Sequence, residues 1–164
     1  MHSDVLASVI LRASGYLSSK GQTFEAESLA KLNKVLHGLD FFPREVLPPG
    51  VLLVHPIGAV IGRVSFKQFT VIYQGVTVGG HPANDEDVRY PLFNGPAVLF
   101  SGATVLGGTT VGAHVAFAAN SMVIDEDIPA GALVVGQYPN HRILAGRGER
   151  ISEMFFNFSG NLRG

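Results

Sequence analysis

Apolar residues near the start of the chain follow helical spacing. They recur at three- and four-residue intervals, at Val5, Val9, Ile10, Leu29, Leu32 and Leu36. Gly15 and Gly21 interrupt the stretch, and glycine commonly marks the end of a helix or a turn. The pattern therefore predicts two helices, over residues 3–14 and 23–38.

Between residues 98 and 136 the apolar positions follow a period of six. The repeated large or branched residues are Leu99, Val105, Val111, Phe117 and Val123. Four residues after each of them stand Ala103, Thr109, Val115, Ser121 and Asp127, which are small or branched except for the last. This period fits neither an amphipathic helix nor the two-residue alternation of a β-sandwich. A short fixed repeat is typical of a β-helix, in which each hexad forms one strand and one corner and three hexads complete a turn.

The six-residue register is weaker before this stretch. Two short series keep it, Phe41, Leu47 and Leu53, and then Ile72 and Val78. The register slips between His55 and Phe69, and the polar segment 79–92 breaks it. We expect segment 79–92 to leave one corner of the solenoid as a loop, the kind of place where function is often located.

The C-terminal segment contains the run Met154-Phe-Phe-Asn-Phe158. We expect a short helix or an arm there, with its phenylalanines packed on a neighbouring copy or on the first helices. The chain thus divides into a helical segment at 1–38, a β-helix domain at 39–146 and an extension at 147–164.

Composition excludes several classes of protein. The 164 residues are 46% hydrophobic and only 15% charged, which argues for a folded domain rather than a disordered chain. Lys and Arg number 12 against 13 Asp and Glu, so no nucleic-acid partner is expected. The lack of cysteine excludes disulfides, Cys-based zinc sites and thiol nucleophiles. The apolar runs are shorter than the roughly 20 residues of a membrane helix, so we expect a cytoplasmic protein without stable membrane insertion.

Several short motifs add to the hexads. They are Asp40-Phe-Phe-Pro43, Gly50-Val-Leu-Leu-Val-His55, Val76-Thr-Val-Gly-Gly80, Arg89-Tyr-Pro91 and Val135-Gly136-Gln-Tyr-Pro139, followed by Arg142. Together they resemble the left-handed β-helix (hexapeptide-repeat) acyltransferases, in particular the serine acetyltransferase group. The likeness covers roughly residues 29–145. It implies a mainly β fold, a left-handed parallel β-helix with a short helical N-terminus and a C-terminal arm.

The resemblance implies an O-acetyltransferase that uses acetyl-CoA as co-substrate and needs no metal. It places His55 as the general base and Asp40 as the carboxylate that orients it. This chemistry is reasonable on its own terms, because histidine titrates near neutral pH and a carboxylate on its other ring nitrogen fixes the tautomer.

The resemblance also implies a homotrimer with acetyl-CoA along the edge of the prism, between two subunits. The positions that match the groove for the pantetheine arm are Gly79, Gly80, Ser101 and Ala119, where small side chains allow close approach to the main chain. Backbone N–H groups near Gly80 could bind the oxyanion. Arg142 is a candidate for the CoA phosphates.

Three departures from the family pattern concern the acceptor. Val54 stands where the family has an aspartate, Tyr90 stands where it has a histidine, and the helical N-terminal region is shorter. We therefore expect acetyl transfer to a changed small-molecule hydroxyl, with a sugar or glycan as the first choice and serine as the alternative. Arg89, Tyr90 and His81 are the candidate acceptor-binding residues.

Two other functions remain open at the level of sequence. Some trimeric β-helix proteins resemble carbonic anhydrases and hold zinc with three histidines across an interface, and His55, His81 and His114 could take that role. The other alternative is a trimer without catalytic activity that binds CoA or a partner protein.

Overall fold

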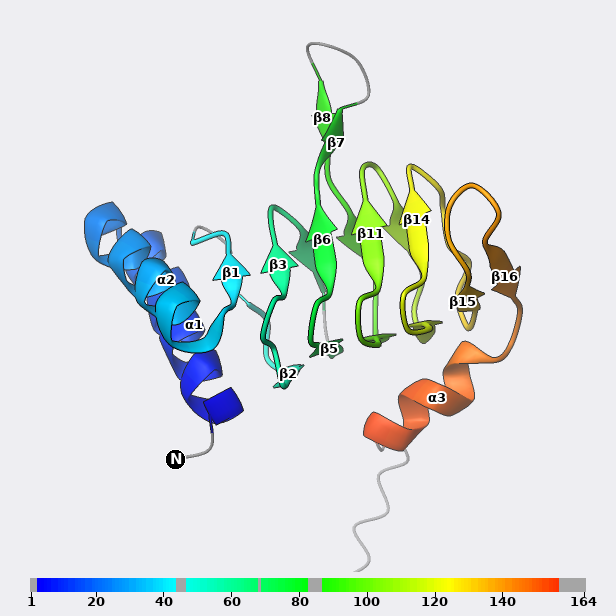
Figure 1. The fold of residues 1–164 in the computed structure, drawn as a ribbon, viewed down its shortest axis with the longest axis horizontal. Coiled ribbons are helices and arrows are strands. Elements are labelled where there is room, and N and C mark those ends of the chain that lie inside the picture. Colours follow the sequence, from blue (N-terminus) through cyan, green and yellow to red (C-terminus); the bar gives the residue numbers. More distant parts are fainter. Residues whose placement is uncertain (1–2, 44–46, 68, 83–86, 157–164) are drawn as a thin grey trace, which may run out of the picture.

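The computed structural model describes residues 3–43, 47–67, 69–82 and 87–156. Two helices that pack against each other precede a β-helix of parallel strands, and a third helix follows it (Figure 1). The helices are α1 (Ser3–Ser19), α2 (Thr23–His37) and α3 (Gly148–Phe155). None of the helices in these ranges combines the length and the apolar character needed to span a membrane.

The first helix is longer than its sequence predicts. The prediction ends it at residue 14, but α1 continues through Gly15 to Ser19. Glycine inside a helix costs only about 1 kcal/mol relative to alanine, and packing against α2 outweighs that cost. The buried Ser14 donates a hydrogen bond to the carbonyl of Ala26 on α2, at 2.8 Å. Gly38 then ends α2 in the left-handed conformation, with φ +64°.

Three faces of hydrogen-bonded strands form the prism of the β-helix. The first face contains, in spatial order, β1 (Asp40–Phe41), β3 (Val60–Ile61), β6 (Thr77–Gly79), β11 (Thr104–Leu106) and β14 (Met122–Ile124). The second face contains β16 (Arg142–Leu144), β15 (Leu133–Val135), β13 (Val115–Phe117), β10 (Ala97–Leu99), β5 (Thr70–Tyr73) and β2 (Val51–Val54). The third contains β12 (Thr110–Val111), β9 (Leu92–Phe93) and β4 (Ser65–Phe66). All pairs in these faces are parallel except β15 with β16.

The hexad residues fill the interior as predicted. All five repeated positions, Leu99, Val105, Val111, Phe117 and Val123, have 0% exposure. Val105 lies beside Val123 in one direction and beside Val78 in the other. The step from Val78 to Val105 is longer than a regular coil because segment 79–92 is inserted there. The prediction of a parallel β-helix is therefore confirmed.

The inserted segment 79–92 leaves the prism as a hairpin arm. Its base is the antiparallel pair β7 (His81–Pro82) and β8 (Val88–Arg89), which projects away from the coils (Figure 1). The arm starts after the strand β6 of the first face and returns to β9 of the third face. The expected loop at a corner is thus present.

The C-terminal phenylalanines pack differently from the prediction. Phe155 and Phe156 lie on the outer surface of the second face of the same chain, not on the first helices. Phe156 contacts Phe69, with ring centroids 5.5 Å apart. The reason is that the second face carries apolar residues outward as well as inward, including Val71 and Val98, and α3 covers them. Phe158 lies outside the described residues.

The core packing generates a stability prediction. Leu99 has 0% exposure inside the prism, so Leu99→Ala should lower the free energy of unfolding by about 2–5 kcal/mol. Met154→Ala removes the same number of heavy atoms from a side chain that is 81% exposed, and should change it by less than about 0.5 kcal/mol. Denaturant titration of both variants measures the difference. Equal losses would contradict the assignment of Leu99 to the core.

Candidate functional site

His55 stands at a corner of the first complete coil. It follows β2 and has a left-handed backbone, with φ +48°, which is uncommon for a residue that carries a Cβ. Its backbone N–H donates a hydrogen bond to Oδ2 of Asp4 on α1, at 3.1 Å. Its side chain is 69% exposed. The first turn of α1 therefore holds the corner in place, and the imidazole remains accessible.

A cavity of about 550 Å³ lies between this corner and the two N-terminal helices. Asp4, His37 and His55 are among its lining residues. Oδ2 of Asp4 is 3.7 Å from Nδ1 of His55, and the side chain of Asp4 is only 19% exposed. The ring of His37 is occupied by a contact of 2.7 Å to the buried Asn33. Asp4 is thus the carboxylate that faces the imidazole of His55.

Asp40 has a different partner. It opens β1, and its carboxylate forms an ion pair of 2.6 Å with Nζ of Lys34 on α2. It lines a separate hollow beside α2, together with Lys34. No hydrogen bond or ion pair joins Asp40 to His55, both of which are described residues. The structure does not bring together the two residues that the sequence proposes as a pair.

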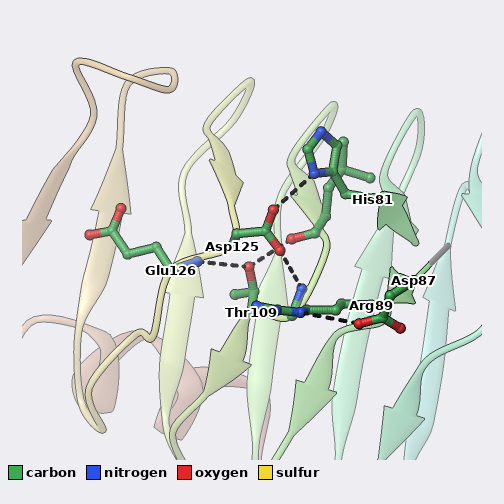
Figure 2. A network of polar contacts seen from close by, with 8 residues as sticks. His81, Asp87, Arg89, Thr109, Asp125 and Glu126 are labelled. Atoms are coloured by element: carbon green, nitrogen blue, oxygen red, sulfur yellow. Dashed lines mark hydrogen bonds and ion pairs between the residues drawn. The ribbon is translucent and has the colours of Figure 1, made fainter. Parts of the chain in front are cut away.

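A second polar cluster lies at the base of the arm (Figure 2). Nδ1 of His81 is 2.8 Å from Oδ2 of Asp125, whose other oxygen accepts a hydrogen bond of 2.7 Å from the backbone N–H of Gly108. Arg89 lies beside them and forms a looser ion pair of 3.7 Å with Asp87. His81 and Asp125 are two coils apart along the chain, so their contact fixes the arm to the prism.

Glycines make room for this cluster. A Cβ at Gly107 would collide with Oδ1 of Asp125, and one at Gly108 would lie 3.0 Å from Cδ of Arg89. Gly107 also has φ +71°, a conformation that favours glycine. The two glycines therefore leave the space that the carboxylate and the guanidinium stem occupy.

The hydrogen bonds and charges around Asp125 favour its ionised form. The backbone N–H of Gly108 contributes most, followed by the contact with His81 and the positive charge of Arg89, against an opposing effect of burial. The net result is a pKa of Asp125 below its ordinary value. Asp125 is therefore a carboxylate at neutral pH.

The predicted site residues lie on two edges of the prism. We call the corners between the second and first faces the His55 edge, which holds His55, Gly58, Gly75, Gly102 and Asn120. We call the corners that follow the first face the His81 edge, which holds Gly80, His81, Gly107, Gly108 and Asp125. One strand of the first face separates the two edges in each coil.

The candidate cofactor residues divide between these edges. Ser101 and Ala119 lie on the His55 edge, at the ends of β10 and β13, and Ala119 is exposed. Gly79 and Gly80 lie on the His81 edge, where a Cβ at Gly80 would come within 2.8 Å of the ring of Tyr90. Arg142 is exposed on β16, at the far end of the prism. A single chain does not gather these residues into one groove.

The histidines of the zinc alternative are also separated. His114 is on the third row of corners, where Nδ1 contacts the buried hydroxyl of Ser152 at 2.9 Å. Within the part of the chain that the structure describes, no group of three His, Cys, Asp or Glu residues could hold a metal ion. A zinc site of this kind would need histidines from different subunits.

Two residues of this geometry were not predicted from the sequence. Asp4 has no motif around it, because its contact with His55 depends on how α1 packs against β2. The position of Asp125 could have been predicted from spacing. It follows Gly107 by 18 residues, the length of one coil, and so occupies the equivalent corner of the next coil. The stacking of equivalent corners could have placed it beside the arm.

Comparison with known proteins identifies relatives of this fold. No family model matches the chain. The chain is 35% identical over 109 residues to a serine acetyltransferase of Synechococcus elongatus, which covers 66% of this chain and 44% of that protein. It is 33% identical over 114 residues to a serine acetyltransferase of Helicobacter pylori, which covers 69% of this chain and 66% of that protein.

Solved structures agree with the sequence relatives. A serine acetyltransferase in complex with cysteine matches with a TM-score of 0.77 and 27% identity, over 87% of this chain and 58% of that one. A serine acetyltransferase in complex with CoA matches with a TM-score of 0.75 and 26% identity, over 88% and 58%. The chain spans between 44% and 66% of the length of these relatives.

The fold is thus a left-handed β-helix built on hexapeptide repeats. The chain belongs to the hexapeptide-repeat acyltransferases, and within them to the group whose matched members are serine acetyltransferases.

The depressed pKa of Asp125 predicts a stability that depends on pH. Because the folded-state pKa lies below the unfolded value of about 3.9, ionised Asp125 stabilises the fold above that pH, and the contribution is lost as the pH falls through the folded-state pKa. Asp125→Asn should lower Tm at pH 7 by about 2–4 °C. The Tm values of variant and wild type should converge as the pH is lowered below about 3.9.

Asp127→Asn is the control for this measurement. Asp127 also accepts a backbone hydrogen bond, a weaker one of 3.2 Å from Thr110, but does not contact His81. Its Tm change at pH 7 should be the smaller of the two. A difference between wild type and Asp125→Asn that does not vary with pH would contradict the role of the carboxylate.

Proposed function

We propose that the chain is an acetyl-CoA-dependent O-acetyltransferase. The observation that carries this proposal is the match to serine acetyltransferase structures over 87% and 88% of this chain, combined with an accessible histidine at the corner after β2. One of the matched structures is a complex with CoA, which supports CoA as the carrier of the acetyl group.

Serine is the acceptor that the comparisons favour. The expectation of a sugar or glycan finds no support among the relatives compared above, which are serine acetyltransferases. We therefore propose L-serine as the acceptor, despite the differences at Val54 and Tyr90. Arg89, Tyr90 and His81 are retained as the proposed acceptor-binding residues.

The proposed mechanism uses His55 as the base. Nε2 of His55 takes the proton of the acceptor hydroxyl while the oxygen attacks the thioester carbon of acetyl-CoA. Backbone N–H groups near Gly80 would donate hydrogen bonds to the oxyanion of the tetrahedral intermediate. The C–S bond then breaks, the CoA thiolate takes the proton from Nε2, and the O-acetyl ester leaves with the neutral base regenerated.

The division of the site between two edges supports a shared active site. His55, Ser101 and Ala119 lie on one edge, whereas His81 and Arg89 lie on the other. We propose a homotrimer in which the His81 edge of one subunit faces the His55 edge of the next. In that arrangement one subunit supplies the base and its neighbour supplies the acceptor-binding side chains.

The first test measures release of free CoA from acetyl-CoA. The panel contains L-serine and several free and nucleotide-linked sugars. We expect turnover with L-serine, and a fall in kcat of about 10²–10⁴ on His55→Ala, because a general base contributes that much. Circular dichroism and acetyl-CoA binding should be unchanged in the variant. Turnover only with a sugar would reject serine, and a fall of less than tenfold would reject His55 as the base.

A second test separates two candidate orienting carboxylates. The resemblance gives this role to Asp40, whereas Asp4 is the carboxylate next to His55 in the structure. We expect Asp4→Asn to lower kcat by at least about tenfold, because it removes the charge that stabilises the imidazolium. Asp40→Asn should have the smaller effect. The opposite order in kcat would assign the role to Asp40 and imply that its ion pair with Lys34 opens in the assembled enzyme.

A further inference from the structure

The contact between His81 and Asp125 has the geometry of a histidine held by a carboxylate. With Nδ1 of His81 2.8 Å from Oδ2 of Asp125, the neutral ring donates its Nδ1–H to the carboxylate. Nε2 then carries the lone pair and is a hydrogen-bond acceptor. The His81 side chain is 40% exposed, so a small molecule can reach the ring.

Asp125 is itself held on both sides. Its second oxygen accepts the hydrogen bond from Gly108, and Gly107 has no Cβ that would obstruct it. Asp125 adopts φ +52°, an uncommon conformation that aims its side chain across the corner toward the arm. The carboxylate is therefore fixed before any ligand arrives, and it determines which nitrogen of His81 faces outward (Figure 2).

The ammonium group of the proposed acceptor needs a partner that accepts hydrogen bonds. An acidic residue before the base would be a natural partner for a cationic ammonium group, but this chain has Val54 there. The Val54 side chain cannot accept a hydrogen bond. His81 can, through Nε2, and the negative charge of Asp125 lies beside it. Arg89 lies on the same edge and offers donors suited to a carboxylate.

We propose that His81 binds the ammonium group of the acceptor through Nε2, with Asp125 as the positioning residue that fixes the tautomer of His81. This inference rests on the proposed function and assigns the residues that would recognise the ammonium group of its amino-acid acceptor. The ammonium N–H donates to Nε2, and the carboxylate of Asp125 balances the charge.

The kinetic test compares L-serine with 3-hydroxypropionate, which has the hydroxyl and the carboxylate but no ammonium group. We expect His81→Ala and Asp125→Asn to raise KM for L-serine by about 10–100-fold while kcat changes less than about threefold, because they remove a partner of a charged group. KM for 3-hydroxypropionate should stay the same. In Asp125→Asn the carboxamide N–H can donate to Nδ1 and leave a proton on Nε2, which turns the acceptor into a donor.

Asp127→Asn is the matched control, because Asp127 also accepts a backbone hydrogen bond at the same turn of the chain but does not contact His81. It should leave both KM values unchanged. Equal changes in KM for the two acceptors would show a purely structural effect and overturn the proposal. The same effect from Asp127→Asn would also overturn it.

A binding measurement separates this inference from the proposed reaction. In protein labelled with ¹⁵N-histidine, long-range ¹H–¹⁵N spectra report which nitrogen of His81 carries the proton. We expect an Nδ1–H tautomer in the wild type, a shift of the Nε2 resonance on addition of L-serine, and neither of these in Asp125→Asn. If this result appears without CoA release, the proposed function fails and the binding site stands. If CoA is released but Nε2 does not respond to L-serine, the binding site fails.

Discussion

Close stacking of corners is the constraint on which the rest of the molecule depends. Each coil must turn in the space left by the coil beneath it. A Cβ at Gly58 would be 3.9 Å from the Cα of Gly75, and one at Gly75 would be 3.7 Å from the Cα of Gly102. The contact is tighter at Gly112, where a Cβ would come within 2.5 Å of the backbone of Ala130. Small residues at corners keep the strands in register, and the apolar hexad positions then fill the prism.

The same constraint determines where chemistry can occur. Many corners contain a left-handed residue, which is usually Gly, but His55 and Asp125 adopt this conformation with φ +48° and +52°. The side chains of His55 and Asp125 are 69% and 32% exposed, so neither is part of the interior of the prism. The cost of the backbone conformation is offset by polar contacts, which are the Asp4 carboxylate on the N–H of His55 and the Gly108 N–H on Asp125. Both candidate site residues therefore occupy corner positions that are more often glycine in this chain.

Sequence reasoning succeeded where structure is periodic. The hexad period was sufficient for the β-helix, because every repeat places an apolar residue at the same interior position, and the break at 79–92 located the arm. It was less successful where contacts depend on tertiary packing. Nothing near Gly15 shows that α1 continues to Ser19, and nothing near Asp4 shows that it reaches His55. The spacing of Asp40 and His55 suggested a pair, but Lys34 on α2, outside the repeat, forms the ion pair with Asp40.

The arm adds residues to the His81 edge without disturbing the register of the coils. Thr77 pairs with Thr104, although the usual 18-residue step, as from Thr104 to Met122, is lengthened by the inserted arm. The insertion therefore leaves the β-helix in register and adds polar side chains to one edge only. The opposite edge carries His55, with the N-terminal helices beside it. In the proposed homotrimer, the candidate base His55 of one chain would meet the candidate acceptor-binding residues only on the His81 edge of its neighbour. Within one chain, α1 places the carboxylate of Asp4 beside His55, and the base of the arm carries His81 and Arg89 on the other edge.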